Sequence, residues 1–283
     1  MGEAMTVSGS HRGVSQNYLV LPSGGELTAQ MRFLTAEPSL GDAKLAFSDL
    51  ALFGISARYS LFSRLELSGR VELLPKQPSY TSEKPWQSVA FVARSPIGNT
   101  AAVAIHGSGG HLLGHDGSWL RQGISLEFRK PIHEVLTFDI HGGLDSTALV
   151  RDGHDGGWVT ELGVSGQALF RDPNGKVGGW VGMAYSIPVA SRGNDPTTDM
   201  PLDPQARLDF RVGGVISLVR EWDLFAEYAV IDRGDLSDPS TRLPILDGGF
   251  DQHQVMFGVT RHIAGKKPSS GGDDDDSMQL AGR

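Results

Sequence analysis

The sequence of 283 residues has no cysteine, and it lacks any run of the ~18 apolar residues that a transmembrane helix requires. The first absence excludes disulfides and thiolate chemistry. The mean hydropathy of −0.17 is ordinary for a water-soluble chain. Barrel strands that cross a membrane, however, expose only every second residue to lipid, so a hydropathy scan does not detect them.

Basic surface and a targeting segment are also missing. Lys and Arg total 25 against 33 Asp and Glu, which gives a net charge of −8, and part of the excess lies in the run 273–276. Without a basic stripe, nucleic-acid binding has no electrostatic basis. Residues 1–5 lack the charged and apolar regions of a signal peptide. For an envelope protein this predicts that a leader has been removed.

A period of two is present along most of the chain. In the segment 26–33, Leu27, Ala29, Met31 and Phe33 fall on one face, and polar residues fall between them. This alternation is the side-chain period of a strand with one apolar and one polar face. About twelve such segments can be recognised. They are 26–34, 52–61, 65–73, 86–94, 100–105, 120–129, 135–145, 158–170, 177–187, 206–218, 222–231 and 252–262.

The joints between these segments alternate in length. The short joints are 62–64, 95–99, 130–134, 171–176 and 219–221, and the long ones are 35–49, 74–85, 106–118, 146–157, 188–205 and 232–250. Pro173, Asn174 and Gly175 suit a tight turn, because proline presets φ while Asn and Gly tolerate positive φ. An even strand number places both ends of the strand region on the short-turn side.

The combined pattern resembles that of bacterial outer-membrane β-barrel proteins over roughly residues 26–263. The resemblance implies an all-β fold, a closed antiparallel transmembrane barrel of about twelve strands, with short periplasmic turns and long extracellular loops. It also implies the outer membrane of a Gram-negative bacterium, with lipid and lipopolysaccharide as neighbours. A soluble β protein, such as a propeller or a sandwich, is the alternative fold.

The same reading divides the chain into three parts. Residues 1–25 are expected to form an N-terminal periplasmic segment and residues 26–263 the barrel. Residues 264–283, with Ser-Gly runs and four Asp, cannot bury apolar surface and are expected to be a disordered acidic tail.

In a membrane barrel the polar face of each strand lines the lumen, and aromatic residues gather at the two membrane interfaces. By parity, the predicted lumen-lining residues are Arg32, Arg58, Glu66, Arg70, Glu72, Arg94, Arg121, Glu127, Asp139, His141, Glu161, Arg207, Asp209, Arg211 and Glu227. The predicted membrane-interface aromatics are Tyr59, Phe62, Phe128, Trp158, Phe170 and Trp222.

Charges inside the barrel must be paired or hydrated. Counting back from the tight turns, we expect Arg211 near Glu227, Arg58 near Glu66, and Arg58 and Arg70 sharing the acids of the third strand. Small residues at inward positions predict room on one side of the lumen, and the polar loop 188–205 is the expected plug. These small residues are Gly123, Gly143, Gly163, Ser165, Gly178, Gly182, Ala184 and Gly213. In the alternative reading, the glycines only relieve strand curvature.

Catalytic and metal-binding patterns are weak. The histidines of the 106–115 stretch and His154 are interpreted as solvated loop residues, because zinc needs a defined frame of ligands. Ser125 and His141 would be the pair for a lipid hydrolase, and Asp145, Asp155 and His154 for a protease. No cofactor, metal or catalytic residue is predicted.

Two functions remain open at this point. The first is a narrow passive channel for small polar solutes or ions, whose selectivity is set by the mixed arginine and acid lumen. The second is a non-conducting barrel that anchors other envelope proteins through its long loops or acidic tail. Replacing Arg58 and Arg70 together by Glu is expected to shift an open channel toward cations without loss of folding.

Overall fold

The computed structural model describes residues 24–36, 51–61, 64–73, 86–111, 117–151, 153, 155–173, 175–194, 201–219, 221–233 and 252–263. The expected segments 1–25 and 264–283 therefore lie almost entirely outside the described residues. In the described part of the chain, no helix is long and apolar enough to cross a membrane.

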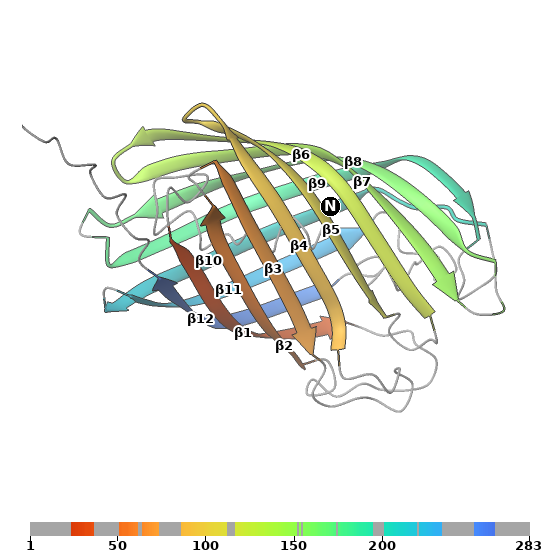
Figure 1. The fold of residues 1–283 in the computed structure, drawn as a ribbon, viewed down its shortest axis with the longest axis horizontal. Helices are drawn as coiled ribbons and strands as arrows, with labels where there is room; N and C mark the ends of the chain where they lie inside the picture. Colours follow the sequence, from red (N-terminus) through yellow and green to blue (C-terminus); the bar gives the residue numbers. More distant parts are fainter. Residues whose placement is uncertain are drawn as a thin grey trace, which may run out of the picture.

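The described residues form twelve β-strands, each antiparallel to the strand before it. The strands are β1 (Gly25–Ala36), β2 (Ala51–Leu61), β3 (Leu65–Leu73), β4 (Trp86–Ile97), β5 (Ala101–His111), β6 (Gly117–His133), β7 (Leu136–Arg151), β8 (Gly157–Arg171), β9 (Val177–Gly193), β10 (Arg207–Val219), β11 (Trp222–Arg233) and β12 (Gln252–Ile263). The first strand pairs with the last, from Gly25 opposite Ile263 to Ala36 opposite Gln252. This pairing closes the sheet into a barrel of tilted strands (Figure 1).

The predicted barrel of twelve strands is confirmed, and the third strand has the predicted bounds. The strict alternation of short and long joints is wrong. The connections 112–116 and 152–156 are as short as the turn 172–176, because β5, β6 and β7 continue into the predicted loops 106–118 and 146–157. In β5 the residues Gly107, Ser108, Gly109 and Gly110 carry no hydropathy contrast, so the ladder with β4 and β6 is needed to reveal the strand.

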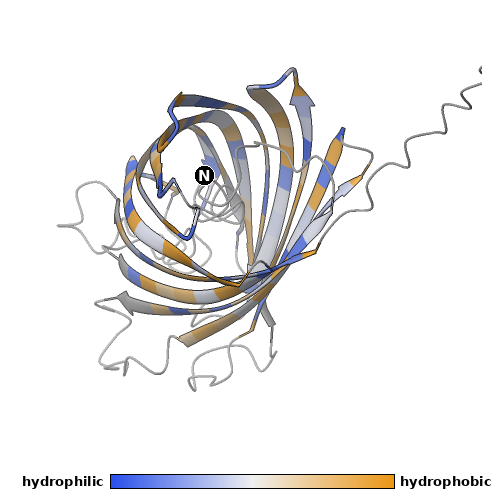
Figure 2. Ribbon diagram, turned by 90° about the vertical axis from the view of Figure 1, so that its left-hand side faces the viewer, coloured by the Kyte–Doolittle hydropathy of each residue, from blue (hydrophilic) through white to orange (hydrophobic). Residues whose placement is uncertain are grey.

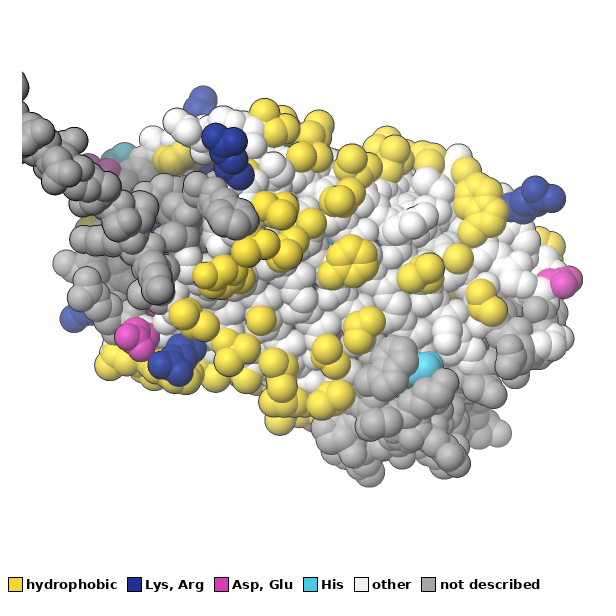
Figure 3. Space-filling model, viewed as in Figure 1, with side chains coloured by type: hydrophobic (Ala, Val, Ile, Leu, Met, Phe, Trp, Pro, Cys, Tyr) yellow, Lys and Arg dark blue, Asp and Glu magenta, His cyan; other side chains and the backbone are white. Residues whose placement is uncertain are grey.

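The polarity of the barrel is inverted relative to a soluble protein. Apolar side chains such as Phe91 and Ile105 are 61% and 57% exposed, whereas Glu66 and Arg94 are 1% exposed. Viewed toward one end, the strands curve into a ring and alternate in hydropathy along their length (Figure 2). On the face in Figure 3, hydrophobic side chains spread over the wall, and Lys, Arg, Asp and Glu lie near its ends. Such an exterior suits lipid.

Apolar residues also pack inside the barrel. One cluster, on β8 to β11, joins Leu169, Trp180, Val215 and Phe225, with Met256 against it. A side chain at Gly213 or Gly258 would collide with the ring of Trp180 or Phe225. The room predicted beside Gly213 is therefore wrong, because an aromatic ring from the neighbouring strand fills it.

The second apolar cluster lies toward the long-loop end and joins Leu149, Val159 and Leu202, with Trp119 against it. Leu202 belongs to the predicted plug loop 188–205. The first part of that loop, up to Gly193, is strand β9 rather than loop. Residues 195–200 lie outside the described residues, so the plug stays a prediction.

Candidate lumen site

Arg94 is the centre of an ion-pair network inside the barrel. Its Nη1 donates to Glu66 Oε1 at 2.9 Å, while Nε and Nη2 donate to the two carboxylate oxygens of Glu127 at 2.6 and 2.9 Å. Glu66 lies on the neighbouring strand β3, but Glu127 lies on β6, beyond β5. The inward residues of β5 at this level are Ala102 and Ala104, which lie opposite Glu127 and Arg94 respectively. Because these side chains are small, the side chain of Arg94 can cross β5 and reach Glu127.

The network continues around the wall in both directions. Arg58 lies 3.8 Å from Glu66 and is hydrogen-bonded to Glu26. Beyond Glu26, the ring of His262 lies between the carboxylates of Glu26, at 3.1 Å, and Asp223, at 2.7 Å. We call this chain of contacts the lumen belt, which consists of Asp223, His262, Glu26, Arg58, Glu66, Arg94 and Glu127. It links β11, β12, β1, β2, β3, β4 and β6, including the seam where the barrel closes.

Further pairs lie on either side of the lumen belt. Arg129 donates to Asp139 at 2.6 Å, and Gln167 donates to the same carboxylate at 3.0 Å. Arg32 donates to Glu72 at 2.7 Å. Arg207 donates to both carboxylate oxygens of Asp209, at 2.6 and 2.8 Å, so acid and arginine are close partners throughout the interior.

A histidine–carboxylate pair lies on the wall formed by β5, β6 and β7. His106 is hydrogen-bonded to Asp145 across β6, where Gly123 leaves the space, because a Cβ there would collide with both partners. His106 and His111 are buried and belong to β5, so the prediction of solvated loop histidines is wrong for these two residues. His115 and His154 lie outside the described residues. Among the described residues, no group of three His, Cys, Asp or Glu could hold a metal ion.

The side chains of the predicted lumen-lining residues are buried or half-buried, and their role in lining a lumen stays a prediction. Arg211 and His141 are the more open of them, with side chains 16% and 14% exposed. The expected neighbours are in contact: Arg211 lies 3.7 Å from Glu227 and Arg70 lies 3.6 Å from Glu72. Because Arg58 lies between two carboxylates, replacing it by Glu would bring three acids together. The structure therefore gives a physical reason to expect a loss of stability from that replacement.

Several interior residues were not in the predicted set. Arg129 has the right parity on β6, so alternation alone could have found it. His106 was missed because glycines follow it, and His262 because it comes just before the end of its strand.

Of the predicted interface aromatics, Tyr59, Phe128, Trp158, Phe170 and Trp222 are between 38% and 53% exposed on the outer face. Trp222 stacks with the guanidinium of Arg261, 5.6 Å from the ring centre. Phe62 lies outside the described residues. The position of these aromatic residues at the membrane interfaces stays a prediction.

Ser125 and His141, the pair considered for a lipid hydrolase, are not directly opposite each other. Ser125 lies opposite Gly143 and His141 lies opposite Glu127, with Nδ1 of His141 3.9 Å from that carboxylate. Of the residues considered for a protease, Asp145 is hydrogen-bonded to His106, and His154 lies outside the described residues.

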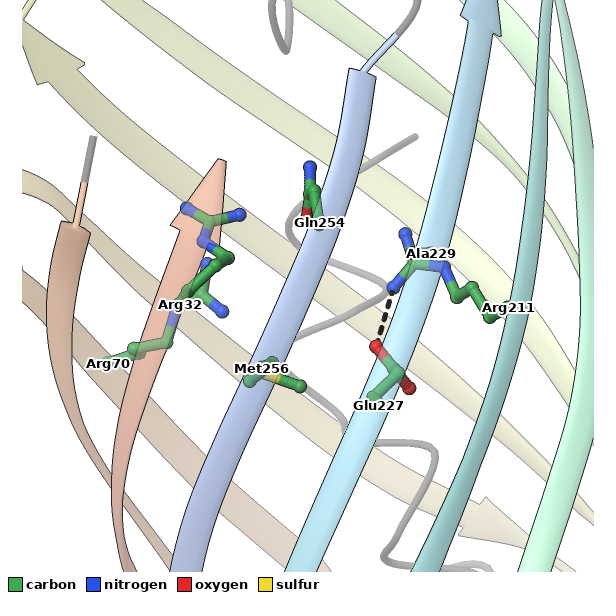
Figure 4. Close-up of a pocket in the computed structure, with 7 residues that line it drawn as sticks. All are labelled: Arg32, Arg70, Arg211, Glu227, Ala229, Gln254 and Met256. Atoms are coloured by element: carbon green, nitrogen blue, oxygen red, sulfur yellow. Dashed lines mark ion pairs between the residues drawn. The ribbon is translucent and has the colours of Figure 1, made fainter. Parts of the chain in front are cut away.

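A pocket opens inside the barrel beside the lumen belt (Figure 4). It is lined by Arg32, Arg70, Arg211, Glu227, Ala229, Gln254 and Met256, and it offers about 20 Å³ to the centres of water-sized molecules. In Figure 4, Arg32 and Arg70 lie to one side of Gln254 and Met256, and Arg211 and Glu227 lie to the other.

No protein-family model and no curated protein sequence matches this chain. Solved structures do match. The translocator domain of the autotransporter NalP from Neisseria meningitidis is 12% identical with a TM-score of 0.53, over 88% of this chain and 92% of that one. An outer-membrane channel from Pseudomonas putida F1 is 12% identical with a TM-score of 0.52, over 87% and 98%. The NanC porin is 8% identical with a TM-score of 0.51, over 83% and 98%.

At these identities the likeness establishes the fold. A closed barrel with an apolar exterior and a charged interior is thus the architecture that this chain shares with these outer-membrane β-barrels.

Proposed function

We propose that this protein is a narrow passive channel for small polar solutes or ions. The observation that carries the proposal is the pocket inside the barrel, most of whose lining side chains are charged or amide groups. The exterior is apolar, so the interior offers a polar solute a lower-energy environment than the surrounding hydrocarbon.

The arrangement of the interior charges supports this proposal. Buried ions are costly unless opposite charges and hydrogen bonds compensate them, and the arginines of the interior are paired with acids. A solute that crosses the lumen would exchange part of its hydration for contacts with these groups. The positions of arginine and acid would then set which solutes cross.

A second function is favoured by a different observation. Side chains that line an open lumen would be exposed to water. Trp180 and Arg94 lie inside the barrel but are only 2% and 1% exposed. A lumen this tightly packed also fits a non-conducting barrel that anchors other envelope proteins. In that case the lumen belt would serve stability alone.

Planar-bilayer recording of the purified full chain separates the two functions. Steady unit openings are expected for a channel, and their decrease with polyethylene glycols of increasing size would measure its width. Heat-denatured protein in the same detergent is the control. If barrels whose insertion is verified by their altered gel mobility stay silent, the channel proposal fails and the anchoring function is favoured.

A further inference from the structure

The pocket inside the barrel has an uneven balance of charge. Three guanidinium groups line it, from Arg32, Arg70 and Arg211, against one carboxylate, from Glu227. Guanidinium groups keep their positive charge at all relevant pH values. The acid that accepts the 2.7 Å bond of Arg32, Glu72, is not among the lining residues. The lining side chains themselves thus carry three positive charges and one negative charge, and each arginine also lies within 4 Å of Glu72 or Asp209.

The strand register explains how these groups converge. Glu227, Met256 and Arg32 are directly opposite one another on β11, β12 and β1. Ala229 lies between Arg211 and Gln254 in the neighbouring row on β10, β11 and β12. The guanidinium of Arg211 and the amide of Gln254 line the pocket on either side of Ala229, which is itself 2% exposed, and both groups are hydrogen-bond donors.

Arg211 is the most adaptable of the three arginines. Its side chain is 16% exposed, against 10% for Arg32 and 6% for Arg70. Its contacts with Asp209, at 3.3 Å, and Glu227, at 3.7 Å, are longer than a charge-assisted hydrogen bond. A planar fork of donors with loose partners can turn to an incoming oxyanion, which arginine binds through two parallel hydrogen bonds.

We propose that this pocket binds the oxyanion group, a carboxylate or a phosphate, of a small anionic solute, which rests on the proposed channel function. Arg211 and Gln254 contact the oxyanion directly, and Arg32 and Arg70 attract it electrostatically from the opposite side of the pocket. Glu227 opposes binding through its like charge and so keeps the solute from being trapped. The binding residues come from four strands, β1, β3, β10 and β12, that are brought together only by barrel closure.

The test is calorimetric titration of the full-length barrel in detergent, with inorganic phosphate and with acetate as separate probes at constant ionic strength. Arg211→Gln is expected to weaken binding roughly ten- to hundredfold, the range for loss of a charge-assisted hydrogen bond. Glu227→Gln is expected to strengthen binding, because it removes the only acid of the lining and its amide can still accept the 2.8 Å hydrogen bond from Trp180. Arg192→Gln, an exposed change of equal charge on β9, is expected to leave binding unchanged.

Opposite effects of Arg211→Gln and Glu227→Gln, with no effect of Arg192→Gln, support the site. Absence of binding by both probes overturns it, as does equal weakening by Arg192→Gln, which would indicate a general surface-charge effect. If Arg211→Gln does not fold, the sign of the Glu227→Gln change still decides. The binding measurement does not depend on conductance. If the barrel binds the probes but is silent in a bilayer, the channel proposal alone is rejected. If it conducts but does not bind them, the anion site alone is rejected.

Discussion

At the scale of single residues, the interior depends on buried charges that compensate one another. Arg94 is 1% exposed and forms three hydrogen bonds with Glu66 and Glu127. Both acids are also almost fully buried. Removing one member of such a set leaves uncompensated charge in a region of low polarity, which is far more costly than losing a surface ion pair.

We therefore expect Arg94→Met to lower the free energy of unfolding by about 3–5 kcal/mol. The measurement is urea unfolding in detergent micelles, followed by tryptophan fluorescence and by gel mobility. Arg64→Met, at an exposed position in the turn between β2 and β3, is the matched control and should change little. Adding Glu66→Gln and Glu127→Gln to Arg94→Met should recover most of the loss. A decrease below about 1 kcal/mol would mean that water hydrates these acids, as at a surface pair.

At the scale of elements, β5 shows how a small-residue strand serves its neighbours. Its inward residues Ala102 and Ala104 are 0% and 1% exposed, and they let Arg94 of β4 reach Glu127 of β6. The same principle operates at Gly213 and Gly258, over which Trp180 and Phe225 lie. Large and small inward residues on adjacent strands therefore interlock, and a strand's own sequence does not reveal which neighbour occupies its space.

A larger side chain at the crossing point should break this arrangement. Ala104→Leu is expected to destabilise the barrel by about 1–3 kcal/mol through overpacking, and to displace Arg94 from Glu127. Ile105→Leu, one residue along and 57% exposed on the outer face, is the parity control. Thermal unfolding of both variants by gel mobility tests this prediction. Equal stability of the two variants would show that Arg94 has another route to Glu127.

At the scale of the whole molecule, the inverted polarity determines the solvent that the barrel requires. Large apolar side chains are exposed around the wall, and the charged network is enclosed. In water, such a surface would associate, so purified protein is expected to need detergent. The closed hydrogen-bonded ladder leaves no free sheet edge among its strands, which is the condition for a sheet to cross a bilayer.

The depth of each outward residue can be tested by charge insertion. Ile124, near the middle of β6, and Ile97, at the turn end of β4, are 50% and 55% exposed. Ile124→Arg should cost about 2–4 kcal/mol and Ile97→Arg about 0–1 kcal/mol, because the cost of a charge in lipid falls toward the interface. The check is unfolding of both variants in lipid vesicles. Equal costs would contradict the proposed orientation, and small costs in both would contradict a lipid-facing wall.

The sequence by itself determined the strand number, the polarity of the two faces and the parity of each charged residue. These features are local, because the period of two follows from the geometry of a single strand. This is why Arg211 and Glu227, or Arg58 and Glu66, could be expected as neighbours across one tight turn. It is also why all twelve strands were recognised, although β5, β6, β7 and β9 extend beyond their predicted ends.

Only the tertiary structure decided which distant residues share the interior. The contact of Arg94 with Glu127 crosses an intervening strand, and that of His262 with Glu26 exists because β1 meets β12. The ring of Trp180 lies over Gly213 because the register between β9 and β10 places these two residues opposite each other. The anion pocket likewise joins β1, β3, β10, β11 and β12. Closure and register set these contacts, and both are fixed by pairing over the whole sheet rather than by any one strand.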